Sequence, residues 1–228
     1  MPTFGKGRSE RPVRRSARKK SRRAVLPTQP NSYMLTHTPL STISRQFNLD
    51  LNTFTQARYR ATRARVGVLD LFCAAGTAIT ELATQNESIV DAFGFSRDPY
   101  PEWVENKHVR FIQEEAESLN RYFKKRSLDL IFSWSGLINY DGLGLEDQNL
   151  IRSPTIFKKR TQKHVHFLNT IMSRLKPGGV LLTSLPLLFV DPLLNEVKKE
   201  HPGIEWGVLR TLRSGTIVAL FVRQSSQV

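Results

Sequence analysis

The segment from Val66 to Ala78 constrains the fold of this chain more than any other stretch of its sequence. An apolar run leads into Asp70, small residues follow, and the residues after Gly76 can start a helix. This order predicts a buried strand, a tight turn and a helix N-terminus. In α/β proteins a nucleotide-like ligand binds in the crevice at the carboxyl end of such a strand. We therefore expect an α/β fold with its ligand site at this turn.

Composition limits the domain count and the class of protein. A chain of 228 residues is long enough for one domain and a tail. Its single cysteine, Cys73, excludes an internal disulfide and fits a reducing compartment. The longest apolar stretch, Val180 to Val190, is interrupted by polar residues and is too short to span a bilayer. We expect a soluble intracellular protein, cytoplasmic unless its basic N-terminus targets it to the nucleus or an organelle.

Positive charge is concentrated at the N-terminal end of the chain, whose net charge is +14. Residues 1–23 hold ten basic residues and one acid, whereas residues 66–228 are almost neutral. The basic stretch has no apolar periodicity, so we expect residues 1–32 to form a disordered tail. Its charge favours contact with RNA, DNA or another polyanion. A targeting signal and the absence of any specific role are the alternatives.

Residues 33–65 are predicted to form a helical extension before the first strand. Phe47, Leu51 and Phe54 recur with Arg58 at helical spacing, which indicates a helix that runs through all four. The arginines at its end are expected to extend the basic surface up to the first strand; they are Arg58, Arg60, Arg63 and Arg65.

From Val66 onward, short apolar runs alternate with amphipathic stretches, a pattern typical of a parallel sheet with helices on its faces. The helix over 155–175 is the best supported, because it has a continuous apolar stripe and is followed by a proline and two glycines. Two β-prone runs, 204–211 and 216–223, predict an antiparallel hairpin that closes the sheet. The other expected strands are 66–72, 89–95, 108–113, 127–133 and 178–185, and the other expected helices are 77–85, 115–125 and 189–200.

Four segments, in this order, resemble the motifs of a known family. The stretch from Asp70 to Gly76 is similar to a motif of the form Asp-x-Gly-x-Gly-x-Gly. The segments 109–117, 128–133 and 175–182 are similar to later motifs, the last of them to an "LKPGG" passage into the fifth strand. The family is that of the class I, Rossmann-like S-adenosylmethionine-dependent methyltransferases. The resemblance implies a Rossmann-like methyltransferase domain over 66–228, with a mostly parallel seven-stranded sheet, helices on both faces and a C-terminal antiparallel hairpin.

The resemblance also implies S-adenosylmethionine as the cofactor. Asp70 would hold its methionine end and Glu115 its adenine end. An acid at the end of the second strand normally binds the ribose hydroxyls, but Ser96 stands there, so we expect Asp98 to take over this role. A weak or degenerate site is the alternative. Further cofactor-binding residues are expected in the turn and at the end of the fourth strand: Phe72, Cys73, Ala74, Gly76 and Ser133.

Two of the family's three glycines are replaced here, by Phe72 and Ala74. Glycine is needed where a backbone approaches a pyrophosphate closely. S-Adenosylmethionine has no phosphate, so we expect Ala74 to be tolerated and Gly76 to be the essential glycine. The missing phosphate-binding pattern argues against an NAD-dependent oxidoreductase. Cys73 has no evident partner histidine and is expected to pack rather than react.

The methyl acceptor is expected to bind after the fourth strand, where Trp134, Tyr140 and Asp141 are the catalytic candidates. Tyr140 or Trp134 would stack on a planar acceptor, and Asp141 would act as a general base. The signatures of amino-base methylation and of attack on carbon 5 of pyrimidines are absent from this stretch. We expect no metal site, because His164 and His166 would lie about 200° apart around a helix axis.

These inferences predict a methyltransferase that acts on RNA or an RNA-associated substrate, with the basic tail as the RNA contact and with no membrane partner. Two alternatives stay open. A small-molecule methyltransferase would leave the tail to targeting, whereas a catalytically inactive Rossmann-like protein would bind RNA or a complex. Ser96 and the two replaced glycines favour the inactive alternative. The oligomeric state stays open as well.

Overall fold

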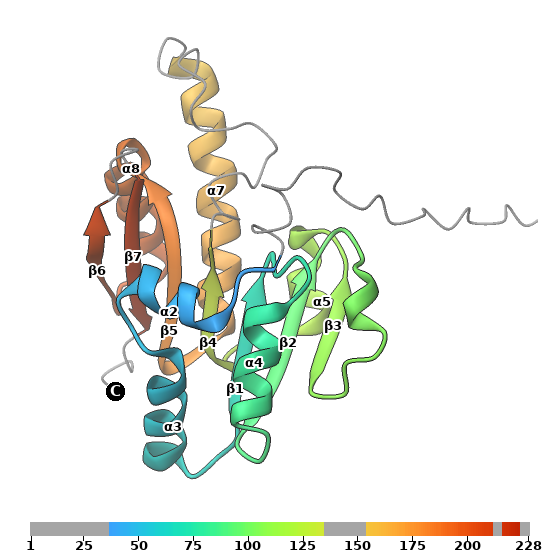
Figure 1. The fold of residues 1–228 in the computed structure, drawn as a ribbon. Helices are drawn as coiled ribbons and strands as arrows, with labels where there is room; N and C mark the ends of the chain where they lie inside the picture. Colours follow the sequence, from blue (N-terminus) through green and yellow to red (C-terminus); the bar gives the residue numbers. More distant parts are fainter. Residues whose placement is uncertain (1–36, 135–153, 212–215, 224–228) are drawn as a thin grey trace, which may run out of the picture.

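A seven-stranded sheet forms the centre of the computed structural model, which describes residues 37–134, 154–211 and 216–223 (Figure 1). Its strands are β1 (Val66–Leu71), β2 (Val90–Ser96), β3 (Val109–Gln113), β4 (Leu128–Ser133), β5 (Leu175–Pro186), β6 (Ile204–Thr211) and β7 (Thr216–Arg223). They lie in the order β3-β2-β1-β4-β5-β7-β6. All neighbours pair in parallel except β7, which runs antiparallel between β5 and β6. The expected fold class and closing hairpin are confirmed, whereas the tail expected over 1–32 lies outside the described residues.

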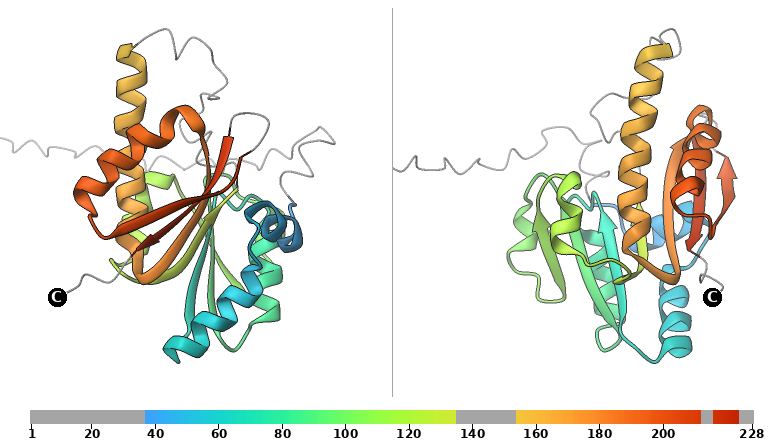
Figure 2. Two further views of the ribbon diagram at one scale, coloured as in Figure 1. Left: turned by 90° about the vertical axis from the view of Figure 1, so that its left-hand side faces the viewer. Right: turned by 180° about the vertical axis from the view of Figure 1, so that it is seen from behind.

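Helices cover both faces of the sheet (Figure 2). One face carries α2 (Leu40–Phe47), α3 (Leu51–Thr62) and α4 (Thr77–Gln85). The other carries α5 (Leu119–Tyr122), α7 (Pro154–Arg174) and α8 (Leu187–Glu200). Two short 3-10 helices, η1 (Pro101–Trp103) and η2 (Ala116–Ser118), follow β2 and β3. Within the described ranges, none of the helices is long and apolar enough to cross a membrane.

Two hydrophobic clusters, one on each face, bury the sheet. In β1, Val66 and Val68 belong to the cluster that includes α2 and α4, while Leu69 and Leu71 belong to the cluster that includes α7 and α8. All six residues of β1 are buried, as expected of a central parallel strand that is covered on both sides. The carboxyl end of β1 is therefore held between two packed layers.

The N-terminal extension consists of two helices, although its spacing predicts a helix that runs through both Phe47 and Leu51. Asn48, at a φ of 49°, adopts a left-handed conformation and ends α2. Asp50 then caps α3, since its carboxylate accepts hydrogen bonds from the Asn52 amide at 3.0 Å and the hydroxyl at position 53 at 2.7 Å. Phe47 and Leu51 belong to the same hydrophobic cluster, so their apolar periodicity continues across the break and conceals it.

Two further boundaries differ from expectation. The helix expected over 115–125 is reduced to η2 and α5, because Phe123 adopts an extended conformation and buries its side chain in the core. The helix expected to end at residue 175 ends at Arg174, and Leu175 already pairs with Leu128 in the sheet. The proline and glycines that follow therefore lie within β5, where Gly178 has a φ of 71°.

A buried ionic cluster ties α3 to the amino ends of the strands. Asp129 of β4 is 1% exposed. It accepts hydrogen bonds from Arg58 Nε at 3.0 Å, from Lys176 Nζ at 2.6 Å and from the amide of Gly67 at 3.0 Å. Arg58 also donates to the carbonyl of Pro177 at 2.8 Å. One guanidinium thus links α3 to both β4 and β5.

Fewer than the four expected arginines therefore contribute free positive charge to the surface before β1. Arg58 is committed to the buried cluster, and Arg65 pairs with Asp91 at 2.7 Å and donates to the Ser88 carbonyl at 2.9 Å. Among the described residues, only Arg60 and Arg63 of the four are exposed without an ion pair. The expectation was wrong for Arg58 and Arg65 because their acidic partners, Asp129 and Asp91, lie far from them in the sequence.

We predict that Asp129→Asn lowers the free energy of unfolding by about 3 kcal/mol, because it leaves two cations beside a buried site without their carboxylate. The matched control is Asp91→Asn, which removes the carboxylate of an exposed ion pair and should cost less than about 1 kcal/mol. Urea unfolding followed by circular dichroism measures both values. Equal effects of the two substitutions would contradict the role given to Asp129.

Candidate functional site

The turn after β1 has an unusual backbone. Phe72, Ala74 and Gly76 all adopt left-handed conformations, with φ values of 68°, 50° and 77°. The amides of Phe72 and Cys73 both donate to the carbonyl of Phe95 in β2, at 2.8 and 3.1 Å. The Gly76 amide donates to the Cys73 carbonyl at 2.8 Å, and Gly76 begins α4 as its N-cap. Two non-glycine residues in left-handed conformations cost about 1–2 kcal/mol each, and such strain tends to gather at functional sites.

Gly76 is required by a neighbouring side chain. A Cβ atom on Gly76 would lie 2.3 Å from Cε1 of Phe111 in β3, and one on Gly94 of β2 would lie 2.4 Å from Cδ1 of the same ring. The ring of Trp103 stacks on Phe111, with centroids 4.8 Å apart and planes at 5°. Its indole nitrogen donates to the carbonyl of Ala74 at 3.0 Å. We expected Gly76 to be essential for the cofactor. The structure shows that packing also requires it, because the ring of Phe111, on which Trp103 stacks, leaves no room for a Cβ. Neither aromatic residue belongs to the motif.

Asp70 carries a buried carboxyl group at the carboxyl end of β1. Its side chain is 7% exposed, and among the described residues no hydrogen-bond donor or cation pairs with it. Burial raises the pKa of this carboxyl to about 8. It lines a cavity of about 40 Å³. The other residues around this cavity are Thr38, Ile43, Phe72, Cys73, Ala74, Ala78 and Trp134.

Cys73 shares this environment and is poorly suited to nucleophilic chemistry. It is 7% exposed. Burial, and next the charge of Asp70, raise the pKa of its thiol well above the ordinary value. A thiolate is the reactive form of cysteine, so these surroundings fit the packing role that we expect for Cys73.

The expected ribose residues lie at the carboxyl ends of β2 and β3. Ser96 ends β2 half-buried, and its carbonyl accepts a hydrogen bond from the amide of Glu114 at 3.1 Å. Asp98 is exposed and pairs with the adjacent Arg97 at 3.1 Å. Glu115 is exposed just before η2, and its charge also acts on Arg97. The structure brings all three predicted residues to one edge, with one arginine between the two acids.

The end of β4 supplies two of the predicted residues. Ser133 is fully buried, and among the residues that the structure describes its hydroxyl has no hydrogen-bond partner. Trp134 contacts Phe47 of α2 edge-on, with ring centroids 5.7 Å apart, and lines the Asp70 cavity. Tyr140 and Asp141, the other two catalytic candidates, lie outside the described residues.

Phe72 packs toward the helix layer that contains α7. It contacts Phe167 of α7 in an edge-on arrangement, with centroids 6.2 Å apart, and packs against the cluster on the α7 face. The side chain of Phe72 therefore anchors the turn to the helix layer opposite α4. Phe72 also lines the cavity beside Asp70.

The segment before α2 and the first half of α2 were missed as part of the site. Thr38 and Ile43 line the Asp70 cavity. His37 pairs with Glu102 of η1 at 2.8 Å, and the amide of Leu40 donates to the Glu81 carboxylate of α4 at 2.8 Å. These contacts join residues at least 41 positions apart. The only signal for them in the sequence is the apolar spacing of α2, which indicates that this helix packs on the sheet.

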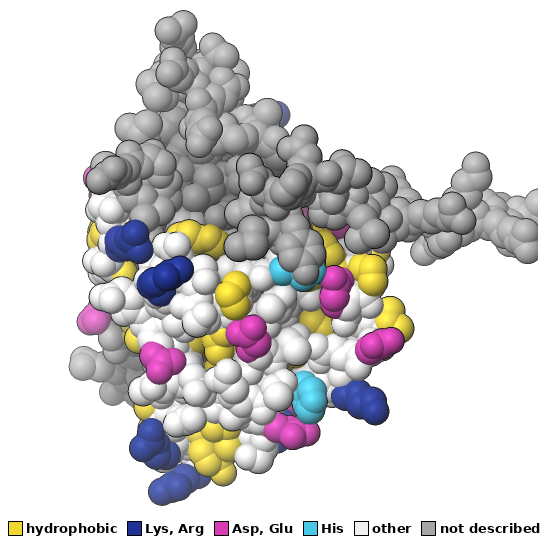
Figure 3. Space-filling view, viewed as in Figure 1, with side chains coloured by type: hydrophobic (Ala, Val, Ile, Leu, Met, Phe, Trp, Pro, Cys, Tyr) yellow, Lys and Arg dark blue, Asp and Glu magenta, His cyan; other side chains and the backbone are white. Residues whose placement is uncertain are grey.

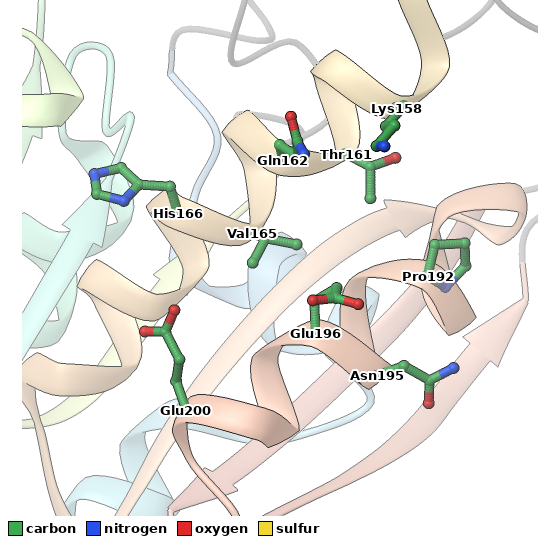
Figure 4. Close-up of a pocket in the computed structure, with 9 residues that line it drawn as sticks. All are labelled: Lys158, Thr161, Gln162, Val165, His166, Pro192, Asn195, Glu196 and Glu200. Carbon is green, nitrogen blue, oxygen red and sulfur yellow. The ribbon is translucent and has the colours of Figure 1, made fainter. Parts of the chain in front are cut away.

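A second hollow lies between α7 and α8, on the other face of the sheet (Figure 4). Its volume is about 570 Å³, and more of its wall is apolar than polar, although only Val165 and Pro192 of the lining residues are hydrophobic. None of the predicted cofactor residues lines it. His166 does, whereas His164 is buried, so the two histidines lie on different sides of α7, as helical geometry predicts.

No family model matches the chain, and no curated protein matches it either. Its fold is similar to that of solved methyltransferases. The plantazolicin methyltransferase BpumL, in complex with SAH, is 12% identical, with a TM-score of 0.57 over 86% of this chain and 88% of that chain. A SAM-dependent methyltransferase from Aquifex aeolicus is 14% identical, with a TM-score of 0.51 over 86% of this chain and 98% of that chain. The chain therefore has the class I, Rossmann-like methyltransferase fold that its motifs resemble.

Proposed function

We propose that this protein is an S-adenosylmethionine-dependent methyltransferase whose acceptor is RNA or an RNA-associated substrate. The observation that carries the proposal is the Asp70 carboxylate, buried at the carboxyl end of β1 without a donor among the described residues. A buried carboxylate is unfavourable unless a cation or several donors pair with it. The methionine part of the cofactor carries an ammonium group, which would supply such a cation.

The residues present fit the cofactor best at its methionine end. A cavity of about 40 Å³ has room for a group the size of an ammonium ion or a methyl group, but not for a nucleoside. The nucleoside would therefore be held by Ser96, Asp98 and Glu115, which lie at the open edge beyond the cavity. The unpaired hydroxyl of Ser133 is one more group at the strand ends that a polar ligand would satisfy.

When bound, the cofactor would supply a methyl group on a positively charged sulfur atom, an already good leaving group. The protein's part is then to align the acceptor with that methyl group and to exclude water. Trp134 would take part in this alignment, and its position supports the role, because it lines the Asp70 cavity and contacts Phe47 edge-on. Stacking by Tyr140 and proton removal by Asp141 remain our proposals for the acceptor side.

The charge distribution supports RNA as the acceptor. Ten of the basic residues lie in the first 23 positions, whereas on the face seen in Figure 3 basic and acidic side chains are interspersed over α2, α3 and α4. A nearly neutral domain with a strongly cationic tail would draw its affinity for a polyanion from the tail. The tail would then hold the substrate while the crevice performs the transfer.

A small or peptidic acceptor is the second candidate. It is favoured by the similarity to the plantazolicin methyltransferase BamL, solved in complex with a triazolic desmethylPZN analog and SAH, at 13% identity and a TM-score of 0.56 over 81% of this chain and 86% of that chain. An inactive binding protein is favoured by the ribose edge, where Ser96 replaces the usual acid and Asp98 is paired with Arg97. Binding of the cofactor separates this last alternative from the other two.

We predict that SAH binds the wild-type protein with release of about one proton per site at pH 7, because the ligand's ammonium would ionise the Asp70 carboxyl, whose pKa is about 8 without ligand. Asp70→Asn should weaken binding at least about tenfold, the usual effect of losing a hydrogen bond to a charged group. Calorimetry in two buffers of different ionisation enthalpy measures both quantities. Asp91→Asn is the control, and equal affinity of wild type and Asp70→Asn would reject the proposed contact.

We predict that Asp70→Asn stabilises the ligand-free protein at neutral and mildly basic pH. The pKa of Asp70 is raised by folding, so the wild type loses stability as the pH rises from the ordinary carboxyl range to about 8. The variant lacks this component, and the difference between the two should grow by a few kcal/mol between about pH 5 and pH 8. Urea unfolding at both pH values measures it. A constant difference would contradict the buried, ionisable state of Asp70.

We predict that deletion of residues 1–32 lowers RNA affinity at least about tenfold near physiological salt and flattens its salt dependence, because most of the phosphate-binding charge is removed. SAH affinity should not change. Fluorescence anisotropy with labelled RNA at several salt concentrations, and calorimetry with SAH, give the two readouts. Unchanged RNA binding, together with full turnover of a small acceptor, would reject the RNA version in favour of the small-molecule one.

A further inference from the structure

We propose that Trp103 is a positioning residue for the cofactor, acting through the turn after β1; this inference rests on the proposed function. Trp103 ends η1, which follows β2 at the edge of the sheet that carries the expected ribose residues. None of the four segments that resemble the family's motifs includes Trp103. Three sets of contacts place it between the turn and the rest of the molecule.

The first contact is a hydrogen bond to the turn itself. The indole nitrogen of Trp103 donates to the carbonyl of Ala74 at 3.0 Å. Ala74 is in a left-handed conformation that an alanine seldom adopts. The only other donor to this carbonyl among the described residues is the thiol of Cys73 at 3.7 Å, and a thiol is a weak donor. The indole therefore supplies the main hydrogen bond that orients the Ala74 peptide.

The second contact fills the space that the glycines leave. Trp103 stacks on Phe111 in parallel planes, and the Phe111 ring lies against Gly76 and Gly94, where no Cβ would fit. The aromatic stack thus packs against Gly76 at the end of the turn, while the indole hydrogen bond holds the Ala74 carbonyl in its middle. Together they restrain a turn that lacks two of the usual glycines and has correspondingly more strain to hold.

The third set of contacts fixes η1 in place. Glu102 pairs with His37 in the segment before α2 at 2.8 Å, and Asn106 donates from its side chain to the Thr80 hydroxyl of α4 at 2.7 Å. Trp103 thus lies on a segment anchored on both sides of it. Such an anchored segment can transmit restraint to the turn, whereas a free loop cannot.

The test compares Trp103→Phe, which keeps an aromatic ring but removes the indole donor, with Trp206→Phe in β6 as the matched control. Trp206 is also partly buried against the core, at the opposite edge of the sheet. We expect amide hydrogen exchange at Gly76 to accelerate about fivefold in Trp103→Phe, because one hydrogen bond of average strength is lost. We expect the Kd for SAH to rise by a similar factor. Neither change should occur in Trp206→Phe.

The two readouts separate the possible failures. Unchanged exchange at Gly76 in Trp103→Phe would overturn the positioning role, whatever the ligand does. Accelerated exchange with an unchanged Kd for SAH would also overturn it, because the restraint would then not serve the cofactor. Accelerated exchange in a protein whose wild type does not bind SAH would leave Trp103 a purely structural residue and would reject the proposed function itself. Accelerated exchange with a weakened Kd, both absent from Trp206→Phe, supports the proposal.

Discussion

The position of the Asp70 carboxylate is the constraint on which the candidate site depends. It projects from a strand that is buried on both faces, and only 7% of the residue is exposed, beside a cavity of about 40 Å³. Burial raises the pKa of the carboxyl to about 8, and no described residue supplies a compensating donor. A group in this state lowers the stability of the folded chain at neutral pH. Packing alone gives no reason for an acid here, whereas a cationic ligand does.

The turn that follows Asp70 is held from both faces of the sheet. Phe72 inserts its ring against Phe167 on the α7 side, and Trp103 bonds the Ala74 carbonyl on the η1 side. In a glycine-rich version of this turn, left-handed conformations carry little steric penalty. Here Phe72 and Ala74 do carry that penalty, so the side-chain contacts take over what backbone freedom otherwise provides. The replaced glycines are therefore weak grounds for regarding the site as degenerate.

The parts of the fold that the sequence predicts are those encoded by local patterns. The strand that ends in Asp70, the helix after Gly76 and the closing hairpin follow from runs of apolar residues and turn residues that lie next to one another. The break between α2 and α3 was hidden because Phe47 and Leu51 pack on the same cluster on either side of it. Helical periodicity reports which face is buried, and it does not report whether the helix is continuous.

The parts of the site that could not be predicted depend on contacts between distant segments. Thr38 lines the cavity beside Asp70, and the Trp103 indole meets a carbonyl 29 positions before it. Neither residue type has a spacing or composition that marks it for such a role. Arg58 and Arg65 were misjudged for the same reason, since their acidic partners, Asp129 and Asp91, come from other strands. A count of charges shows how many are present and not which of them are neutralised.

The two ends of the site differ in a way that bears on whether the fold can support catalysis. The proposed methionine end holds the buried, unpaired carboxyl of Asp70, which is mostly protonated at neutral pH, whereas the proposed ribose end is an edge where Asp98 pairs with Arg97. Both side chains of this pair are largely exposed, and such a pair contributes only about 0–1 kcal/mol. A hydrogen bond from a ribose hydroxyl to a carboxylate contributes about 1.5–3 kcal/mol. A ribose bound by Asp98, as we propose, would therefore contribute more than the release of Arg97 costs, and Ser96 at the end of β2 would not prevent cofactor binding.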